Sequence, residues 1–392
     1  MDNPATQQSS TLARRYKKIL ICITEDWFAL SHFQPLMRTL VELADEVVIA
    51  TRSSGRMLEI EALGCRTVDF DFRRSSLHPL AQADVVRRLS RLVTAEKPDV
   101  VHAIAMQVMV VASMVTRISR APHTVLHLTG LGFLGISEGR AARLIRPLAL
   151  RLLARTLRRS GSWLLAENPD DVAFLRDGGA DPGNRVTILG GAGIDEMEFP
   201  ALPLPANAIP VAAFVGRMIR SKGVHVLIEA QRLLAERGVP LQVSLYGKTD
   251  EDNPEGVPRT EIERWTRQHG VVWHGHVSDI RNVWAGADIA VLPAITREGL
   301  PRSVLEAAAS ARPLVVTDVP GCRHVVRRDV EGLIVPPGDA VALADALSRL
   351  ANDPALRKSM GANARERVLG GFTIAHVTAG IRDAYARLRP QA

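Results

Sequence analysis

The chain has 392 residues, of which 46% are hydrophobic and 23% charged, and its formal net charge is +7. This is ordinary globular usage, which excludes a disordered or fibrous protein, and the length suits two domains of about 200 residues each. Three cysteines, Cys22, Cys65 and Cys322, are too few and too scattered for a disulfide framework or a zinc cage. A reducing, cytoplasmic setting is expected.

No export signal or membrane span is expected near the start of the chain. Residues 1–10 are polar overall, and the apolar run at residues 19–23 is too short for the core of a signal peptide. The longest apolar stretch, residues 100–115, contains His102 and Gln107 and falls short of a bilayer span. We expect it to be a buried strand that runs into a helix.

The excess of positive charge is local. Residues 117–159 hold nine arginines and one glutamate, so this segment carries +8 and the rest of the chain is close to neutral. A basic face suggests an anionic partner, either a phospholipid surface, a lipid diphosphate or nucleic acid. Nucleic acid is disfavoured because no recognition-helix or stacking-aromatic motif occurs and aromatic residues make up 4% of the chain.

Short apolar runs alternate with helical stretches, a pattern typical of βαβ units and parallel sheets. In the first half, strands are expected at residues 18–23, 46–50, 65–70, 99–103, 123–128, 162–166 and 185–189. In the second half, strands are expected at residues 211–215, 241–246, 271–273, 288–292, 313–317 and 332–335, with helices at 221–237 and 302–311 between them.

Prolines in residues 199–205 disfavour a helix and indicate a linker between the first and the second series of strands. The predicted fold class is α/β, with two doubly wound Rossmann-like domains that face each other across a cleft. The first is expected at residues 1–200 and the second at residues 206–371. In such folds the ligand binds in the cleft.

Two glutamates eight residues apart follow the strand expected at 288–292. Pro301 suits the first turn of a helix, so Glu298 is expected in the loop that follows the strand and Glu306 on an early helical turn. Ligands bind at this edge of open α/β sheets. The structural alternatives are an exposed loop acid for Glu298 and a residue that offsets the helix dipole for Glu306.

Residues 216–223, with the sequence Gly-Arg-Met-Ile-Arg-Ser-Lys-Gly, follow the strand expected at 211–215. Ser221 suits the N-cap of the next helix, and the backbone N–H groups of this segment, from Gly216 onward, form with Arg217 and Lys222 a candidate diphosphate site. Cations fixed there would stabilise negative charge that develops on a diphosphate in a transition state, in place of a divalent metal. The alternative is a solvated basic turn.

Residues 297–307, Arg-Glu-Gly-Leu-Pro-Arg-Ser-Val-Leu-Glu-Ala, resemble the E-x7-E signature of glycosyltransferase family 4. Further matches are residues 191–195, 216–218 with 222–223, 252–254 and 317–323. The resemblance implies the GT-B fold, retaining transfer of a sugar from a nucleotide diphosphate donor without a metal or other cofactor, and a C-terminal helix at 372–388 that packs back on the first domain. Residues 129–132, 252–254, 299–303 and 317–323 also resemble the branch that extends undecaprenyl-diphosphate-linked sugars, such as the transferases that add N-acetylgalactosamine to lipid-linked diacetylbacillosamine.

The resemblance assigns roles to individual residues. The residue at Glu306 would hydrogen-bond the ribose hydroxyls and the residue at Glu298 would contact the transferred sugar, since paired acceptors suit a diol. Gly299 and Leu300 would present backbone N–H groups to the donor sugar, and the turn Gly191-Ala192-Gly193 would let the backbone approach across the cleft.

Two histidines are candidates to touch the donor sugar. His102 is expected to end a strand at the cleft rim, and His127 precedes the loop at 129–132, with a structural role as the alternative for each. The segments 69–71 and 250–252 mimic the metal-binding D-x-D of another glycosyltransferase fold, but neither has that fold's remaining signatures around it, so we expect no metal site.

The leading hypothesis is a retaining, metal-independent hexosyl- or N-acetylhexosaminyltransferase that uses a uridine diphosphate sugar to extend a lipid-linked glycan. The alternatives are a nucleotide-sugar 2-epimerase on the same fold and a basic nucleic-acid-binding protein.

From residue 147 onward, arginines recur on one face of an expected helix and leucines on the other. This pattern predicts peripheral attachment to an anionic membrane, at the cytoplasmic face of the inner membrane. The arginines are Arg151, Arg155, Arg158 and Arg159, and the leucines are Leu150, Leu153 and Leu157. Core leucines with merely solvated arginines are the alternative.

Overall fold

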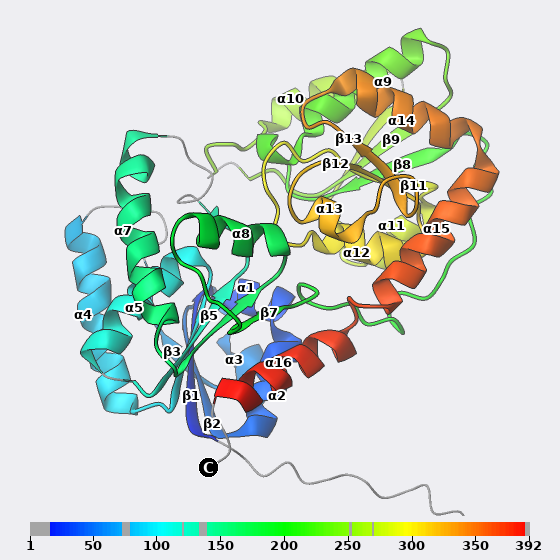
Figure 1. Ribbon diagram of the computed structural model, residues 1–392. Helices are drawn as coiled ribbons and strands as arrows, with labels where there is room; N and C mark the ends of the chain where they lie inside the picture. Colours follow the sequence, from blue (N-terminus) through cyan, green and yellow to red (C-terminus); the bar gives the residue numbers. More distant parts are fainter. Residues whose placement is uncertain are drawn as a thin grey trace, which may run out of the picture.

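The structure is a computed structural model and describes residues 16–72, 79–119, 121–132, 139–250, 253–268 and 270–388. Over these residues the chain forms two parallel sheets, of seven and six strands. Figure 1 shows them in two separate lobes, the first formed by the blue-to-green half of the chain and the second by the green-to-orange half.

The first sheet has the order β3-β2-β1-β4-β5-β6-β7. Its strands are β1 Tyr16–Glu25, β2 Ala44–Arg52, β3 Arg66–Asp69, β4 Val100–Ile104, β5 His123–Leu128, β6 Ser162–Ala166 and β7 Val186–Ile188. The helices between them are α1 Asp26–His32, α2 Gln34–Leu43, α3 Met57–Glu61, α4 Pro79–Glu96, α5 Met106–Ile118, α7 Arg140–Leu157 and α8 Pro169–Asp177. Strands β4 and β6 are buried at every position because helices cover both faces of the sheet.

The second sheet has the order β10-β9-β8-β11-β12-β13. Its strands are β8 Val211–Val215, β9 Gln242–Tyr246, β10 Val271–Gly275, β11 Ile289–Leu292, β12 Leu314–Thr317 and β13 Gly332–Val335. Its helices are α9 Val224–Glu236, α10 Arg259–Trp265, α11 Ile280–Gly286, α12 Arg302–Ala309, α13 Cys322–Val325, α14 Ala340–Asn352 and α15 Pro354–Leu369, with a 3-10 turn at Arg220–Lys222.

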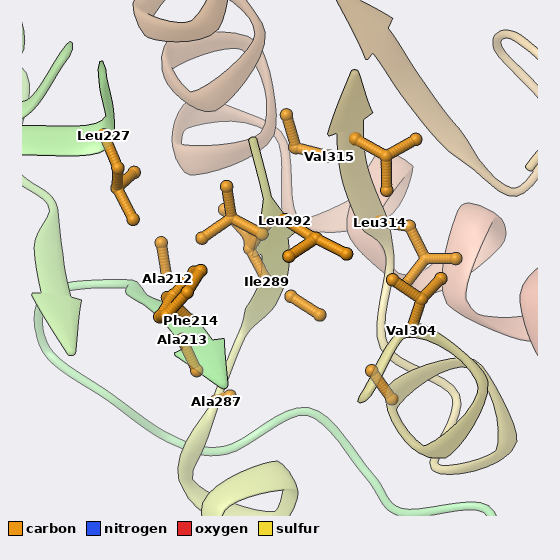
Figure 2. Packing of buried hydrophobic residues seen from close by; sticks show 14 of the residues in the cluster. Ala212, Ala213, Phe214, Leu227, Ala287, Ile289, Leu292, Val304, Leu314 and Val315 are labelled. Carbon is orange, nitrogen blue, oxygen red and sulfur yellow. The ribbon is translucent and has the colours of Figure 1, made fainter. Parts of the chain in front are cut away.

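The core of the second lobe is formed around the central strands. Figure 2 shows Leu292 of β11 between Phe214 of β8 and the side chains Leu314 and Val315 of β12, with Val304 of α12 near Leu314. All of these side chains are nearly inaccessible to solvent. Burial of each such side chain contributes about 1.5–3 kcal/mol to folding, so α12 is anchored firmly beneath the loop that precedes it.

The C-terminal helix α16, Ile374–Leu388, returns to the first lobe. It contacts α2, β6 and β7, and its residues Val377, Ile381 and Tyr385 belong to the same buried cluster as α1 and α2. Figure 1 shows this red helix beside α2, far from the sheet that precedes it in the chain. The packing expected for the C-terminal segment is thus observed, whereas the domain boundaries at residues 200 and 206 stay a prediction.

Every strand expected from the sequence coincides with or overlaps a strand of the structure, and the ranges 123–128, 162–166, 211–215 and 332–335 match it at both ends. The stretch at 100–115 is indeed a strand, β4, that leads into α5. Continuous apolar runs identify parallel strands well because both faces of these strands are buried.

Candidate active site

Both sheets reverse their strand order beside the central strand, between β1 and β4 and between β8 and β11. Crevices at such reversals, outside the carboxyl ends of the strands, bind ligands in open α/β folds. In the second sheet the segments that leave β8 and β11 are residues 216–223 and 293–301, and the structure brings them together. The backbone N–H of Ile295 donates a hydrogen bond to the carbonyl of Ser221 at 2.9 Å.

Gly223 allows this close approach. It adopts φ +73°, and a Cβ atom there would lie 1.8 Å from the carbonyl oxygen of Pro293, so only glycine fits. Gly223 also occupies the N-cap position of α9 without a side-chain cap, while Ser221 lies inside the 3-10 turn. The expectation that Ser221 caps the helix is therefore wrong, because the turn tightens before the helix starts.

Lys222 and Glu298 form an ion pair at this edge. The Lys222 Nζ atom lies 2.8 Å from Glu298 Oε1 and 2.7 Å from Oε2, and the two side chains are 21% and 14% exposed. The cation expected to bind a diphosphate and the carboxylate expected to bind the transferred sugar thus meet, although they come from different loops.

Arg217 and Gly216 do not take part in the contact between Lys222 and Glu298. The Arg217 side chain is 56% exposed, and its Nη1 atom lies 2.8 Å from Asp250 Oδ2. The Gly216 N–H donates to the carbonyl of Tyr246 at 3.0 Å, so it is not available to an anion as the sequence suggested. The reason is that β9 runs directly beside β8, and its backbone takes the first donor after the strand.

Glu306 lies on the second turn of α12 and is 6% exposed. Burial raises the pKa of its carboxyl, and Arg302 on the preceding turn opposes this shift, with its Nε atom 2.8 Å from Glu306 Oε1. Arg302 also donates to the carbonyl of Ser31 in the first lobe. Pro301 occupies the N-cap position of α12, directly before the first helical turn in which it was expected.

Gly299 and Leu300 lie against the first lobe. A Cβ atom on Gly299 would be 2.3 Å from Glu167 Oε2 and 2.6 Å from the carbonyl of Thr129, so this position requires glycine. Glu167 of the first lobe therefore lies directly against the loop that carries Glu298. The expectation that the Leu300 N–H faces the donor sugar stays a prediction.

Three further contacts tie α8 to the second lobe. Asn168 Nδ2 donates to the carbonyl of Gly299 at 2.9 Å, and Asp171 Oδ1 lies 3.0 Å from Arg297 Nη2. Asp170 Oδ1 lies 2.7 Å from Arg323 Nη2. The start of α8 and the loop that carries Glu298 are thus one connected interface.

The two glycines of the 191–193 turn have different neighbours. Gly191 adopts φ +68°, and a Cβ there would lie 2.9 Å from Leu300 Cδ2. Gly193 instead lies against the backbone of Ile374, 2.9 Å from where its Cβ would be. Gly191 therefore lies against the loop at Leu300, whereas Gly193 lies against Ile374 at the start of α16.

The expectation that His102 ends its strand at the cleft rim is wrong. His102 lies in the middle of β4 with 0% exposure, its Nδ1 2.8 Å from Tyr385 Oη and its Nε2 3.3 Å from His127 Nδ1. Burial lowers the pKa of both histidines, that of His127 to about 3, so both are neutral. The structure gives His102 a place in a buried chain of polar contacts that reaches α16.

His32 of the first lobe is a further residue of this site, beside the cations Arg302 and Lys222. It ends α1 and is half-buried, and its Nδ1 lies 2.7 Å from Ser31 Oγ. Burial lowers its pKa to about 4, and the cations Arg302 and Lys222 add to this shift, so a neutral imidazole faces the second lobe. The residue that sequence reasoning missed is Glu167, although its position directly after a buried strand and before the Asn-Pro start of a helix was a usable signal.

Within the described part of the chain, no three His, Cys, Asp or Glu side chains gather in a way that could hold a metal ion. Asp69 accepts the Ser53 N–H at 3.2 Å, and Asp250 pairs with Arg217. Asp252 lies outside the described residues. Metal independence stays a prediction.

Comparisons with known proteins agree with this arrangement. The family described as "Glycosyl transferases group 1" matches residues 209–353, and "Glycosyl transferase 4-like domain" matches residues 31–191. The N,N'-diacetylbacillosaminyl-diphospho-undecaprenol alpha-1,3-N-acetylgalactosaminyltransferase of Campylobacter jejuni is 24% identical over 351 residues, covering 86% of this chain and 90% of the relative. The UDP-Gal:alpha-D-GlcNAc-diphosphoundecaprenol alpha-1,3-galactosyltransferase of Escherichia coli is 23% identical, covering 76% and 77%.

The structural comparison supports the same class. The crystal structure of Anabaena HepE in complex with UDP and glucose superposes with a TM-score of 0.74 at 18% identity, covering 94% of this chain and 99% of that one. Two parallel-sheet lobes with a site between them define the GT-B fold, and the protein is a glycosyltransferase of that fold. The two matched glycosyltransferase domain families, one in each lobe, together span most of both sheets.

Proposed function

We propose that the protein is a retaining transferase that moves a hexose or N-acetylhexosamine from a UDP-sugar to a lipid-linked glycan in cell-surface polysaccharide assembly. Two relatives support the acceptor, since each is named for transfer to a diphospho-undecaprenol-linked sugar. The UDP complex of HepE supports the nucleotide.

The observation that carries this proposal is the pair formed by Lys222 and Glu298, 2.7 Å apart, where the segments after β8 and β11 meet. A lysine here is placed to stabilise the charge that develops on a leaving diphosphate, and this requires no metal. The carboxylates of Glu298 and Glu306 are acceptors suited to sugar and ribose hydroxyls.

A panel of nucleotide sugars incubated with lipid extracts tests the proposal. We expect one UDP-sugar to add a single sugar mass to a lipid-linked glycan, with the anomeric configuration of the donor retained, and we expect EDTA to leave the rate unchanged. Product masses by mass spectrometry and the anomeric coupling by NMR are the measurements. Free sugar isomers without a larger glycan would indicate an epimerase, and loss of activity in EDTA with recovery on added magnesium would disprove the metal-free mechanism.

We propose further that the protein attaches peripherally to the cytoplasmic face of the inner membrane through α7. None of the helices in the described residues is long and apolar enough to cross a bilayer. The outer face of α7 carries exposed Leu144 and Leu148, 75% and 65% accessible, followed by exposed Arg151 and Arg155 on the same stripe. The leucines of the opposite face, such as Leu153 with 0% exposure, belong to the core.

The arginines that face solvent are expected to control membrane binding. Arg159 is not one of them, because it donates to the carbonyl of Ala121 at 2.9 Å and supports the fold. Replacing Arg151, Arg155 and Arg158 together with glutamine should abolish sedimentation with anionic vesicles, since each arginine near the surface contributes about 1 kcal/mol. Wild type should not bind zwitterionic vesicles and should be released by high salt.

The matched control removes the same charge elsewhere. Arg264, Arg267 and Lys358 are exposed in the second lobe, and their replacement by glutamine should leave vesicle binding intact. Equal binding of wild type to both kinds of vesicle, or equal loss in both triple variants, would contradict attachment through α7.

A further inference from the structure

Asn168 and Asp171 of the first lobe bond to the two residues that flank Glu298. Asn168 Nδ2 donates to the carbonyl of Gly299 at 2.9 Å, and Arg297 Nη2 donates to Asp171 Oδ1 at 3.0 Å. These bonds join residues 131 and 126 positions apart in the sequence. The backbone that carries Glu298 is therefore held on both sides by the start of α8, which belongs to the other lobe.

Asn168 and Asp171 are themselves fixed, and we call this pair the α8 anchor. Asn168 is fully buried and caps α8, because its Oδ1 atom accepts the Asp171 N–H at 2.9 Å. Its Nδ2 atom also donates to Asp171 Oδ2 at 3.0 Å, so both oxygens of this carboxylate, which is 1% exposed, have a partner. The Arg297 guanidinium lies over the ring of Phe174 on the next turn of α8, 5.9 Å from its centre. Hydrogen-bonded networks with so little access to water are rigid.

The loop is confined on its opposite side as well. The Glu298 N–H donates to the carbonyl of Pro320 at 3.1 Å, and a Cβ atom on Gly321 would lie 2.3 Å from the carbonyl oxygen of Gly299. The Gly299 carbonyl thus lies between Asn168 of the first lobe and Gly321 of the second. Loss of the Asn168 amide removes the donor that holds this carbonyl from the side of the first lobe.

The Glu298 side chain depends on the position of this backbone. Its carboxylate oxygens lie 2.8 and 2.7 Å from Lys222 Nζ, which comes from a different loop. Groups that act on a transition state must be held within about 0.5 Å of their working geometry. A misplacement of about 1 Å can lower the rate about a hundredfold.

We propose that Asn168 and Asp171 are positioning residues of the donor site, which hold residues 297 and 299 and thereby fix the Glu298 carboxylate beside Lys222. The inference rests on the proposed function, because it gives the position of Glu298 a role in sugar transfer. Both residues act through the loop and not by contact with the donor. Because they belong to the first lobe, the loop is held in place only while α8 lies against the second lobe.

Amide hydrogen exchange tests the α8 anchor without any substrate. Asn168→Ser keeps a good N-cap for α8 but lacks the amide that bonds Gly299. In the ligand-free protein at pH 7, the Glu298 amide should exchange about tenfold faster in this variant than in wild type, the change expected when one buried hydrogen bond is lost. Asp177→Asn, an exposed acid at the other end of α8, is the matched control and should have no effect.

Asp171→Asn is the second variant, and it keeps the shape of the side chain while removing the charge that pairs with Arg297. The Glu298 amide should again exchange faster than in wild type, because Arg297 no longer has its carboxylate. Wild-type exchange at Glu298 in both Asn168→Ser and Asp171→Asn would overturn the proposal.

Steady-state kinetics tests the role through the split between kcat and KM. Asn168→Ser and Asp171→Asn should each lower kcat about tenfold, with the donor KM within about threefold of wild type, because the displaced group acts at the reacting centre. In a Glu298→Gln background the same two substitutions should lower kcat less than about twofold, since the carboxylate that they position is already gone. An equal tenfold fall in both backgrounds would show an effect that does not pass through Glu298, and it would overturn the positioning role.

The two measurements separate this inference from the proposed function, because exchange at Glu298 needs neither donor nor acceptor. Faster exchange in a protein that turns over no nucleotide sugar would refute the proposed function and leave the α8 anchor in place. Wild-type exchange in both variants of an active transferase would refute the anchor alone.

Discussion

Replacing Lys222 with alanine is expected to weaken the binding of UDP by about 1.5 to 3 kcal/mol, the range for hydrogen bonds to charged groups. Lys222 is paired with Glu298 and is 21% exposed, so its charge is weakly screened. Its loss also leaves the Glu298 carboxylate without its cation at the place where the diphosphate is expected, which adds repulsion.

Arg217→Ala serves as the comparison for Lys222→Ala. The Arg217 side chain is 56% exposed and paired with Asp250, so we expect a loss at the lower end of the range, about 1.5 kcal/mol. Titration calorimetry with UDP measures both variants, and Arg264→Ala on the exposed face of α10 is the control. Unchanged UDP affinity in both Lys222→Ala and Arg217→Ala would refute the diphosphate site.

Substitutions of Glu298 and of Glu306 are expected to impair different steps, turnover in one case and UDP binding in the other. Glu298→Gln should lower kcat by about a hundredfold, the cost of removing one group that acts on the transition state, with a smaller change in donor KM. Glu306→Ala should chiefly weaken UDP binding, by about 1.5 to 3 kcal/mol, because it removes an acceptor for a remote part of the donor.

Steady-state kinetics with the donor found in the panel, together with UDP calorimetry, separates the two effects. Glu306→Gln is the control for shape, since Glu306 is 6% exposed beside Arg302 and its removal leaves a cavity. Circular dichroism on each variant shows whether the fold is intact. Equal loss of UDP affinity in Glu298→Gln and Glu306→Ala, with kcat unchanged in both, would contradict the division of roles.

The strands and the loops that follow them were predictable because the signals are local. A run such as residues 289–292, buried at every position of β11, is apolar throughout because helices cover both faces of a parallel sheet. Pro301 and the glycines of residues 216–223 mark where strands give way to helices. The positions of Glu298 in a loop and Glu306 on a helix follow from these signals alone.

Which acceptor a backbone N–H group bonds, and whether a histidine ring is buried, depended on residues distant in the sequence. The Gly216 N–H is taken by Tyr246 because β9 lies beside β8, and His102 is buried because α16 returns to the first lobe and places Tyr385 against it. A strand's sequence reports that it is buried, but it does not report which strand or helix buries it.

By itself, the sequence determined the α/β class, the order of strands and helices, the family and the two segments that carry Lys222 and Glu298, since each depends on periodicity and on residues close together in the chain. Only the tertiary structure decided that these two side chains pair at 2.7 Å, that His32 lies near them as a neutral ring, and that Glu167 lies against Gly299. These contacts join different loops or different lobes, and the packing of the two sheets sets the distances between them.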